Sequence, residues 1–454
     1  MLSLLCMSVI VAATTHDILQ TSHPVWDVAI LDVNGDGYND VAALSSVEGA
    51  YPPEKHILIF WGDDSGRFHS KRVYDFPLTP GAGNAFFSEV DGQSPSELIV
   101  VGSHGFTVYS FVNEQFIESE IVPIVSIYPV NTREPLFLKE VSVDLDGDGK
   151  EEWLVPVPGG FAIWNTSGLW HELLADIPGE VADIGGEYIT YRVPKVYVAP
   201  LENQQETVLA FLSDRVADFY YGKDLSQSKR YRIPKTLEQR WDAHTDMKDI
   251  NSDGWPDLLV TQTEGTINMN VLTQIYMGQP SFTYSSKPEF QIETKGGFSA
   301  PALADVNNDN LIDLVMVSIP FSLRNIANFF IRKKISIRID IHLQHESGFP
   351  KKPSFRTYMT MEAPDGRERL TYAWGDFNND GFLDAIIGSG EDSLNIFTRT
   401  EKELLSSKPW KSFDIPAFGV ARSVDLDGRG GDDLILFHPG IQESQRIDIV
   451  QFSP

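Results

Sequence analysis

Residues 32–40 read DVNGDGYND and place an acidic or amide side chain at the first, third, fifth and ninth positions. A glycine follows the fifth position, where it permits a tight backbone turn. Four other stretches repeat the pattern: residues 144–152 (DLDGDGKEE), 249–257 (DINSDGWPD), 305–313 (DVNNDNLID) and 376–384 (DFNNDGFLD). Asp, Asn and Gly are common turn residues, which is explanation enough for one copy but not for five with acids at positions one, five and nine.

Three weaker copies fill the gaps between the intact ones. Residues 425–433 carry Arg429 at the fifth position, and residues 89–97 and 198–206 keep only part of the pattern. The eight copies begin at residues 32, 89, 144, 198, 249, 305, 376 and 425, so successive copies are 57, 55, 54, 51, 56, 71 and 49 residues apart. A period this regular over nearly the whole chain indicates a repeat architecture.

Each copy has the same surroundings. A short apolar stretch such as residues 28–31 precedes it, a β-rich run such as residues 258–260 follows, and a third strand such as residues 57–61 comes next. A fourth, less regular segment closes each unit, and four strands in about 55 residues are typical of one propeller blade. The sequence therefore predicts an all-β fold, a β-propeller with eight blades, or seven if one weak copy does not form a blade.

The two ends of the chain favour a closed ring. The last copy is followed by a third strand at residues 446–452, close to the end of the sequence, whereas residues 17–20 precede the first copy without a blade of their own. We expect the N-terminal strand to complete the last blade, because this pairing removes an open sheet edge.

The motif itself indicates a calcium site. Ca²⁺ takes six to eight oxygen ligands, and alternate Asp or Asn side chains in a tight loop turn several oxygens towards one centre. An EF-hand is excluded, because it requires Glu at position twelve, where the five intact copies have apolar residues. The acid at position nine closes the site instead. The predicted Ca²⁺ ligands are Asp32, Asn34, Asp36, Asp40, Asp144, Asp146, Asp148, Glu152, Asp249, Asn251, Asp253, Asp257, Asp305, Asn307, Asp309, Asp313, Asp376, Asn378, Asp380 and Asp384.

The weaker copies differ in what they predict for metal. Arg429 replaces the fifth-position oxygen of the last copy, and its guanidinium can substitute for the charge of a cation, so we expect no metal there. The copy at residues 89–97, with Gln93 and Ser94, is a doubtful site, and the copy at residues 198–206 has lost it.

These motifs resemble the FG-GAP/VCBS repeat family, which includes the propeller of integrin α-chains, and the resemblance covers roughly residues 17–454. It implies β-propeller blades with Ca²⁺ in the hairpin loop between neighbouring strands, and an extracellular or periplasmic location. It does not imply one activity, because such propellers act as adhesion heads, carbohydrate binders, scaffolds and, more rarely, polysaccharide lyases.

The N-terminus predicts export. Residues 1–13 are apolar without a charged side chain, a length that suits a signal peptide and is too short to span a bilayer. We expect residues 1–16 to form the signal region, with cleavage near Ala13, and residues 17–454 to form one propeller that is secreted, periplasmic or at the cell surface. No membrane-spanning segment is expected after cleavage. Cys6 is the single cysteine, so the mature chain would hold no disulfide.

Charge and motifs favour binding over catalysis. The net charge of −28 repels phosphate backbones, so nucleic acid is not an expected partner. The sequence has no H-E-x-x-H, G-x-S-x-G, P-loop or CxxC motif. His244, crowded by Asp242 and Asp246, is interpreted as a surface or loop histidine. We therefore expect a binding or scaffold module for a protein or glycan, and no catalytic residues; the alternative is a propeller lyase or hydrolase acting on polysaccharide. The oligomeric state stays open.

One interval, from residue 305 to residue 376, is about fifteen residues longer than the period, and residues 319–334 account for the excess. Leu323, Ile326, Phe330 and Lys334 follow helical spacing, which predicts a short amphipathic helix. This basic and apolar insertion either docks on an acidic partner surface or packs Leu323, Ile326 and Phe330 against the adjoining blade.

Overall fold

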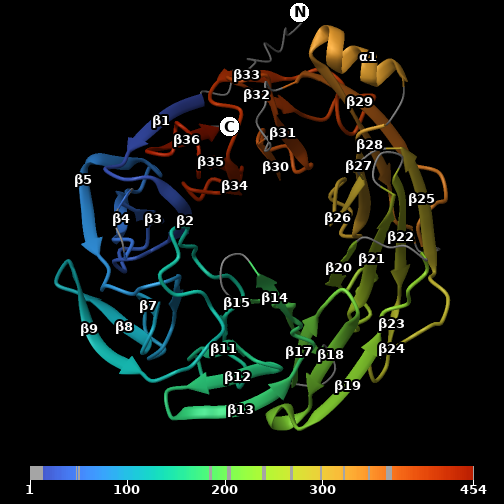
Figure 1. Cartoon of the computed structure of the whole chain (residues 1–454). Coiled ribbons are helices and arrows are strands. Elements are labelled where there is room, and N and C mark those ends of the chain that lie inside the picture. The colour runs from blue at the N-terminus through green and yellow to red at the C-terminus, as the bar shows by residue number, and fades with distance from the viewer. Residues whose placement is uncertain are drawn as a thin grey trace, which may run out of the picture.

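The computed structural model describes residues 14–47, 49, 52–183, 187–201, 206–237, 242–265, 269–296, 299–320, 323–345, 348–363 and 371–452. These residues form eight four-stranded antiparallel sheets arranged as blades around a central axis (Figure 1). The prediction of an eight-bladed propeller is confirmed, and the two weakest motif copies also lie in full blades. Residues 1–13 lie outside the described residues, so the signal region stays a prediction.

The first four blades follow one another along the chain, each with its strands in sequence order. Blade 1 contains β2 (Val25–Leu31), β3 (Asp40–Ser46), β4 (Lys55–Gly62) and β5 (Phe68–Pro77); blade 2 contains β6 (Ala85–Ser88), β7 (Glu97–Gly102), β8 (Gly105–Val112) and β9 (Gln115–Val122); blade 3 contains β10 (Ser142–Val143), β11 (Glu152–Val157), β12 (Gly160–Asn165) and β13 (Gly168–Leu174); blade 4 contains β16 (Lys195–Leu201), β17 (Glu206–Leu212), β18 (Val216–Tyr221) and β19 (Gln227–Arg232).

The last four blades follow the same plan, with the chain's first strand completing the eighth. Blade 5 contains β20 (Asp242–Lys248), β21 (Asp257–Glu264), β22 (Met269–Tyr276) and β25 (Phe290–Gly296); blade 6 contains β26 (Ser299–Ala304), β27 (Asp313–Ser318), β28 (Lys334–His342) and β29 (Phe355–Glu362); blade 7 contains β30 (Tyr372–Gly375), β31 (Asp384–Ser389), β32 (Ser393–Phe397) and β33 (Lys411–Asp414); blade 8 contains β34 (Val420–Val424), β35 (Asp433–Phe437), β36 (Arg446–Phe452) and β1 (Thr14–Gln20).

A few elements lie outside the blades. They are the hairpin of β14 (Gly179–Asp183) and β15 (Glu187–Tyr191), the short pair β23 (Gly278–Gln279) and β24 (Thr283–Tyr284), the 3₁₀ turn η1 (Lys223–Leu225) and the helix α1 (Leu323–Arg332). The predicted helix in the insertion is thus confirmed. Among the described residues, no helix has the length and apolar character needed to cross a membrane.

The ring closes as the sequence predicts, by pairing the two ends of the chain. β1 runs antiparallel to β36, from Thr14 opposite Phe452 to Gln20 opposite Arg446. Residues 14–16, which we expected to belong to the signal region, lie in this strand, so cleavage near Ala13 would keep the strand whole whereas cleavage after His16 would not. Because β1 occupies the outer edge of blade 8, the last sheet has the same four strands as the other blades.

The core lies between neighbouring blades. The second strands of the blades are largely buried; every residue of β3 and of β31 is buried, which explains their nearly unbroken small or apolar runs. At the junction of blades 1 and 8, Phe60 packs in one cluster with Ile435 and Ile449. Side chains from adjacent sheets therefore fix each blade against the next.

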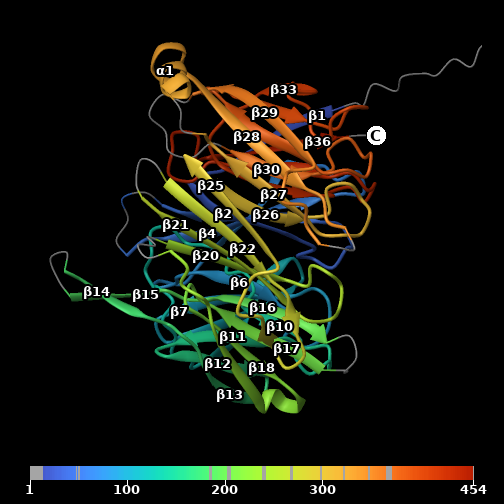
Figure 2. The ribbon, with the colours of Figure 1, turned by 90° about the vertical axis from the view of Figure 1, so that its right-hand side faces the viewer.

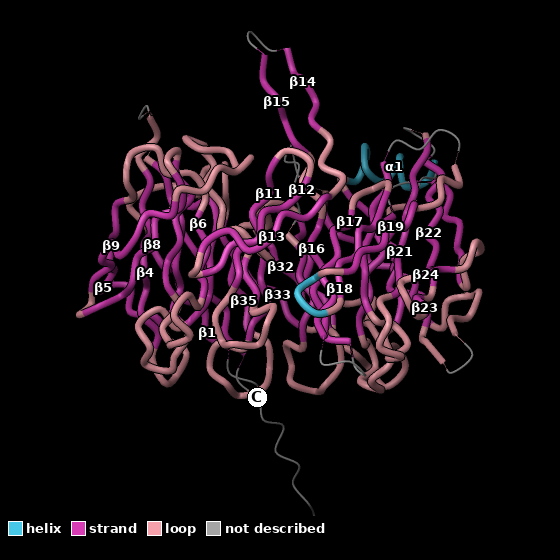
Figure 3. Tube along the Cα trace, turned by 90° about the horizontal axis from the view of Figure 1, so that it is seen from below, coloured by secondary structure: helices cyan, strands magenta, loops and turns pink. Residues whose placement is uncertain are grey.

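The antiparallel order gives the ring two different faces. Turns from first to second and from third to fourth strands lie on one face, which we call the loop face because the motif copies are first-to-second turns. Turns from second to third strands and connections between blades lie on the opposite face. Hairpin β14–β15 connects two blades and α1 joins β27 to β28, so both stand on this second face, which we call the hairpin face (Figures 2 and 3).

Candidate metal sites

The five intact motif copies form the turns between the first and second strands of blades 1, 3, 5, 6 and 7, and we number each loop by its blade. Position nine of the motif is the first residue of the second strand in every case, such as Asp40 in β3. Position twelve, such as Ala43 or Val260, lies within that strand. The exclusion of an EF-hand is therefore confirmed, because a strand stands where the second helix would begin.

The loop backbone explains the small and amide residues of the motif. In loop 1 both Gly35 and Gly37, at positions four and six, have positive φ angles of 76° and 89°. In loop 6 the same two positions are Asn308 and Asn310, with φ of 57° and 67°. Asn tolerates this left-handed region better than most residues with a Cβ atom. Asn310 therefore maintains the turn where the sequence departs from glycine.

The carboxylate at position one organises each loop from inside. Asp32 accepts hydrogen bonds from the backbone N–H groups of Gly35 at 2.7 Å, Asp36 at 3.1 Å and Gly37 at 2.7 Å. The bond from position six recurs in all five intact loops, at 2.7–2.9 Å. Because these bonds orient the carboxylate from behind, its remaining lone pairs can face the centre of the loop.

The acid at position nine is buried beneath each loop. It accepts a hydrogen bond from the N–H of position two at 2.8–3.1 Å in all five intact copies. Asp40, Asp257 and Asp313 also accept a backbone N–H from the end of the third strand, at 2.8, 2.6 and 2.8 Å. This acid therefore ties the loop to two strands of its blade as well as lying next to the other motif carboxylates.

Burial makes these acids hard to ionise. Burial, together with the neighbouring charges of Asp380 and Asp376, raises the pKa of Asp384 to about 8. Burial likewise raises the pKa of Asp257 to about 7, of Glu152 to about 7 and of Asp40 to about 6. A bound cation would reverse this effect, since it stabilises the ionised carboxylate.

The residues fit a hard cation on two observations. In loop 3, oxygens of Asp144, Asp146 and Glu152 lie within 4.8 Å of one another. In loop 7, Asp384 Oδ1 is buried and has no hydrogen-bond partner among the described residues, which is costly unless a ligand completes its coordination. In each intact loop the predicted residues at positions one, three, five and nine would hold the ion, and all twenty of them lie in or directly after these turns.

The three loops with weaker motifs differ in how their carboxylates are arranged. In loop 8, oxygens of Asp425, Asp427 and Asp433 also lie within 4.8 Å of one another, although the sequence predicts no metal there. Arg429 lies 3.2 Å from Asp427, as expected if the guanidinium supplies the missing positive charge. In loop 2, Ser96 donates a hydrogen bond to Glu89 at 2.5 Å, which occupies one of its carboxylate oxygens. The centre of loop 4, residues 202–205, lies outside the described residues.

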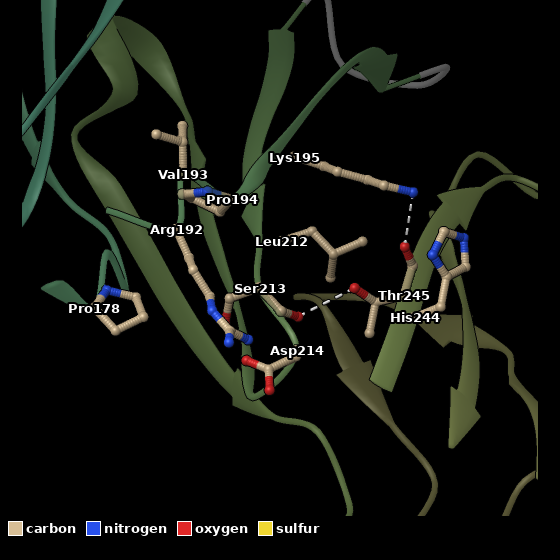
Figure 4. A pocket seen from close by; sticks show the side chains of 10 residues that line it. All are labelled: Pro178, Arg192, Val193, Pro194, Lys195, Leu212, Ser213, Asp214, His244 and Thr245. Atoms are coloured by element: carbon tan, nitrogen blue, oxygen red, sulfur yellow. Dashed lines mark hydrogen bonds between the residues drawn. The ribbon is translucent and has the colours of Figure 1, made fainter. Parts of the chain in front are cut away.

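His244 lies on β20 and faces a small pocket of about 150 Å³ on the hairpin face (Figure 4). Lys195 donates to the carbonyl of Thr245 at 3.0 Å and lies 3.9 Å from Asp246, and Thr245 donates to the carbonyl of Ser213 at 3.1 Å. His244 is exposed, as predicted for a surface histidine. The sequence did not predict this pocket, because its residues come from three separate connections and share no spacing.

A comparison with protein families finds the repeat in part of the chain. Residues 249–316, which include loops 5 and 6, match the model of the FG-GAP-like repeat. No curated protein matches the chain. The chain is similar to two crystal structures of BBS1N in complex with ARL6DN. One, soaked with mercury, is 10% identical with a TM-score of 0.38, and the other, soaked with lead, is 11% identical with a TM-score of 0.39; each comparison covers 97% of this chain and 96% of that chain.

Proposed function

We propose that this chain, an FG-GAP repeat β-propeller of eight blades, is an exported, calcium-stabilised module that binds a protein partner on its hairpin face. Binding rather than catalysis is supported by the contrast between its two faces. The loop face carries the acidic motifs, which stabilise the ring, whereas the hairpin face carries two elements that no blade requires. The observation that carries the proposal is the exposed apolar surface of α1.

Helix α1 presents apolar side chains to solvent. Phe330 is 73% exposed and Ile331 is 80% exposed, and Phe329 stacks edge-on against Phe330 with ring centroids 5.3 Å apart. The expectation that Phe330 packs against the adjoining blade is therefore wrong, while the side chains of Leu323 and Ile326 lie outside what the structure describes. Adjacent exposed apolar residues of this size are typical of interaction surfaces.

The hairpin provides a second apolar element on the same face. Val181 and Ile189 are paired across β14 and β15, and both side chains are mostly exposed. A two-stranded hairpin in isolation is marginally stable in water, so contact with another surface would stabilise it. Figure 2 shows the hairpin extending well beyond the blades.

Charge indicates the chemistry of the partner. Arg332, Lys333 and Lys334 are exposed at the end of α1, in a stretch with no acid between residues 314 and 339, although the chain as a whole is acidic. A partner with acidic groups around an apolar pocket would be attracted to α1 and repelled by most other surfaces of the ring. We therefore propose an acidic protein surface as the ligand of this face.

The partner site is tested with two matched variants. Phe330→Ser combined with Ile331→Ser removes the apolar surface of α1, whereas Leu174→Ser removes a side chain that is also 73% exposed but lies on the outer strand of blade 3. Affinity purification from the extracellular fraction should recover a partner with wild type and Leu174→Ser but not with the α1 variant, at equal melting temperatures. A partner retained by the α1 variant would refute the site.

The calcium part of the proposal has its own test. Asp380→Ala removes a ligand from an intact loop, whereas Gln93→Ala changes the corresponding position of degenerate loop 2. Metal analysis of protein dialysed against calcium should show one ion fewer for Asp380→Ala and no change for Gln93→Ala. Equal calcium in wild type and Asp380→Ala would contradict the ligand assignment.

A further inference from the structure

A groove of about 510 Å³ lies on the outer rim of the loop face, where blades 1 and 2 meet. It is larger than the pocket beside His244 and falls within the size range of small-molecule sites. Four elements form it: the edge of loop 1, strands β4 and β5 of blade 1, and the turn from β8 to β9 of blade 2. Residues that line it include Asn34, Asp36, Trp61, Arg72, Tyr74, Phe111 and Glu114.

One wall of the groove is aromatic. Ring centroids lie 5.5 Å apart for Trp61 and Phe111, 6.1 Å for Tyr74 and Phe111, and 6.3 Å for Trp61 and Tyr74. At these distances the rings touch one another, so no ligand can enter between them as it would in an aromatic cage for a quaternary ammonium. A ligand must instead lie flat on the wall. All three side chains are only half-buried, so part of each ring stays open to the groove.

The opposite side of the groove is polar. Arg72 and Glu114 pair across the boundary between blades, with 3.3 Å between the guanidinium and the carboxylate, and both side chains are mostly exposed. Asn34 and Asp36 line the end next to loop 1. Tyr74 Oη accepts the N–H of Phe116 at 3.1 Å, which leaves its own hydrogen to donate. Donors and acceptors therefore stand beside an apolar wall.

We propose that this groove binds a neutral saccharide unit. A pyranose has one face of C–H groups, which pack on aromatic rings, and a rim of hydroxyls, which both donate and accept hydrogen bonds; the wall and the polar side match these two features. Arg72 and Glu114 neutralise each other, and the three carboxylates of loop 1 outweigh the double charge of a bound Ca²⁺, so the groove has no net positive charge to attract an acidic sugar. Packing between the two blades accounts for the contacts among the three rings. It does not account for the part of each ring that stays exposed next to the Arg72–Glu114 ion pair.

Saccharide binding in the groove would add a second ligand to the proposed binding function. It can be absent even if the protein partner binds at α1, and the reverse also holds. The groove is on the loop face and α1 is on the hairpin face, so changes in one need not affect the other. Deleting the apolar surface of α1 should leave saccharide binding intact, and changing Trp61 should leave the protein partner bound.

The test uses neutral disaccharides as probes: cellobiose, maltose, lactose and N,N′-diacetylchitobiose, with a digalacturonate as the acidic comparison. Each is titrated into the calcium-loaded chain and followed by calorimetry and saturation-transfer NMR. We expect saturable binding of at least one neutral probe, weaker binding of digalacturonate, and a loss of about tenfold or more in affinity for Trp61→Ala.

The matched control is Trp410→Ala, which removes a 43% exposed tryptophan from blade 7 and should leave the affinity unchanged. Because Trp61 contributes to packing, Arg72→Ala serves as a second variant on an exposed side chain and should also weaken binding. The proposal is overturned if no neutral probe binds saturably, if digalacturonate binds most tightly, or if Trp61→Ala and Arg72→Ala bind as well as wild type.

Discussion

Asp448 lies on β36, where β1 closes the ring, and we call the cluster of His16, His438, Arg446 and Asp448 the closing seam. Asp448 and Asp384 of loop 7 are both fully buried carboxylates, yet their pKa values shift in opposite directions. Burial alone would raise the pKa of Asp448, but hydrogen bonds from His16, His438 and Arg446 hold it well below the usual range. Burial and, to a smaller extent, the nearby charges of Asp380 and Asp376 together raise the pKa of Asp384 to about 8.

The difference lies in where the positive charge comes from. At the seam, His16 Nε2 on β1 lies 2.7 Å from Asp448, His438 Nε2 lies 3.0 Å from it, and Arg446 Nε donates to it at 2.9 Å. The chain supplies every partner there, whereas the motif residues of loops 1, 5, 6 and 7 include no cationic side chain. We infer that ring closure is independent of metal and that the intact loops depend on an external cation.

Removing calcium should have the largest effect, because it acts on all five intact loops at once. At a free calcium concentration a hundredfold above the dissociation constant, each independent site adds about 2.7 kcal/mol to the free energy of unfolding. We expect the melting temperature to fall in chelator and to recover when calcium, but not the same concentration of sodium, is restored. An unchanged midpoint would reduce the motifs to ordinary turns and remove the contrast with the seam.

Removing the charge of Asp448 should have the next largest effect on the free energy of unfolding. Asp448→Asn leaves Arg446 and the buried His438 without their carboxylate, and removing one partner of a buried pair costs about 3–5 kcal/mol. The loss should be equal with and without calcium in denaturant unfolding. Asp17→Asn is the control, because Asp17 lies on the same strand pair with an exposed side chain, so its effect should stay within about 0.5 kcal/mol. A calcium-dependent loss for Asp448→Asn would contradict a self-sufficient seam.

The loops could be predicted from the sequence, whereas the cluster around Asp448 could not. The blades, their number and the pairing of β1 with β36 followed from a local motif with a constant period, because each blade repeats the same short-range connections. The seam did not, because His16 and Asp448 are separated by 432 residues and neither belongs to the motif. Hairpin β14–β15 and the groove beside Trp61 were also missed, since they occur once and depend on contacts between blades.

The pH dependence of stability tests the raised pKa of Asp384 in loop 7. Without metal, Asp384 has a folded pKa of about 8 against about 3.9 when unfolded, so folding takes up a proton between these values. Its contribution to stability is therefore lost as the pH rises towards 8. Asp448, whose folded pKa is lowered, contributes constantly above about pH 4.

We expect metal-free wild type to lose more stability than Asp384→Asn between pH 5 and pH 8, as measured by thermal unfolding in chelator. With saturating calcium the order should reverse, because the ion requires the ionised carboxylate and the variant cannot supply it. Parallel pH profiles for the two proteins in chelator would show that the pKa of Asp384 is not raised.

The smallest net effect on stability is expected where a loop already resembles the seam. In loop 8, Arg429 lies 3.2 Å from Asp427 and provides an internal cation among Asp425, Asp427 and Asp433. Arg429→Asp restores the acid that the intact loops have at position five. The variant should be less stable than wild type in chelator, because a positive charge is replaced by a negative one among carboxylates.

In calcium the bound ion should replace the charge that Arg429→Asp removes, so the free energy of unfolding should return to within about 0.5 kcal/mol of wild type. The bound calcium should rise by one ion per chain in metal analysis. Lys408→Asp makes the same change in charge at an exposed position outside the loops and should change neither quantity. If Arg429→Asp gains no ion, the arginine is not what keeps loop 8 free of metal, and the analogy between loop 8 and the seam fails.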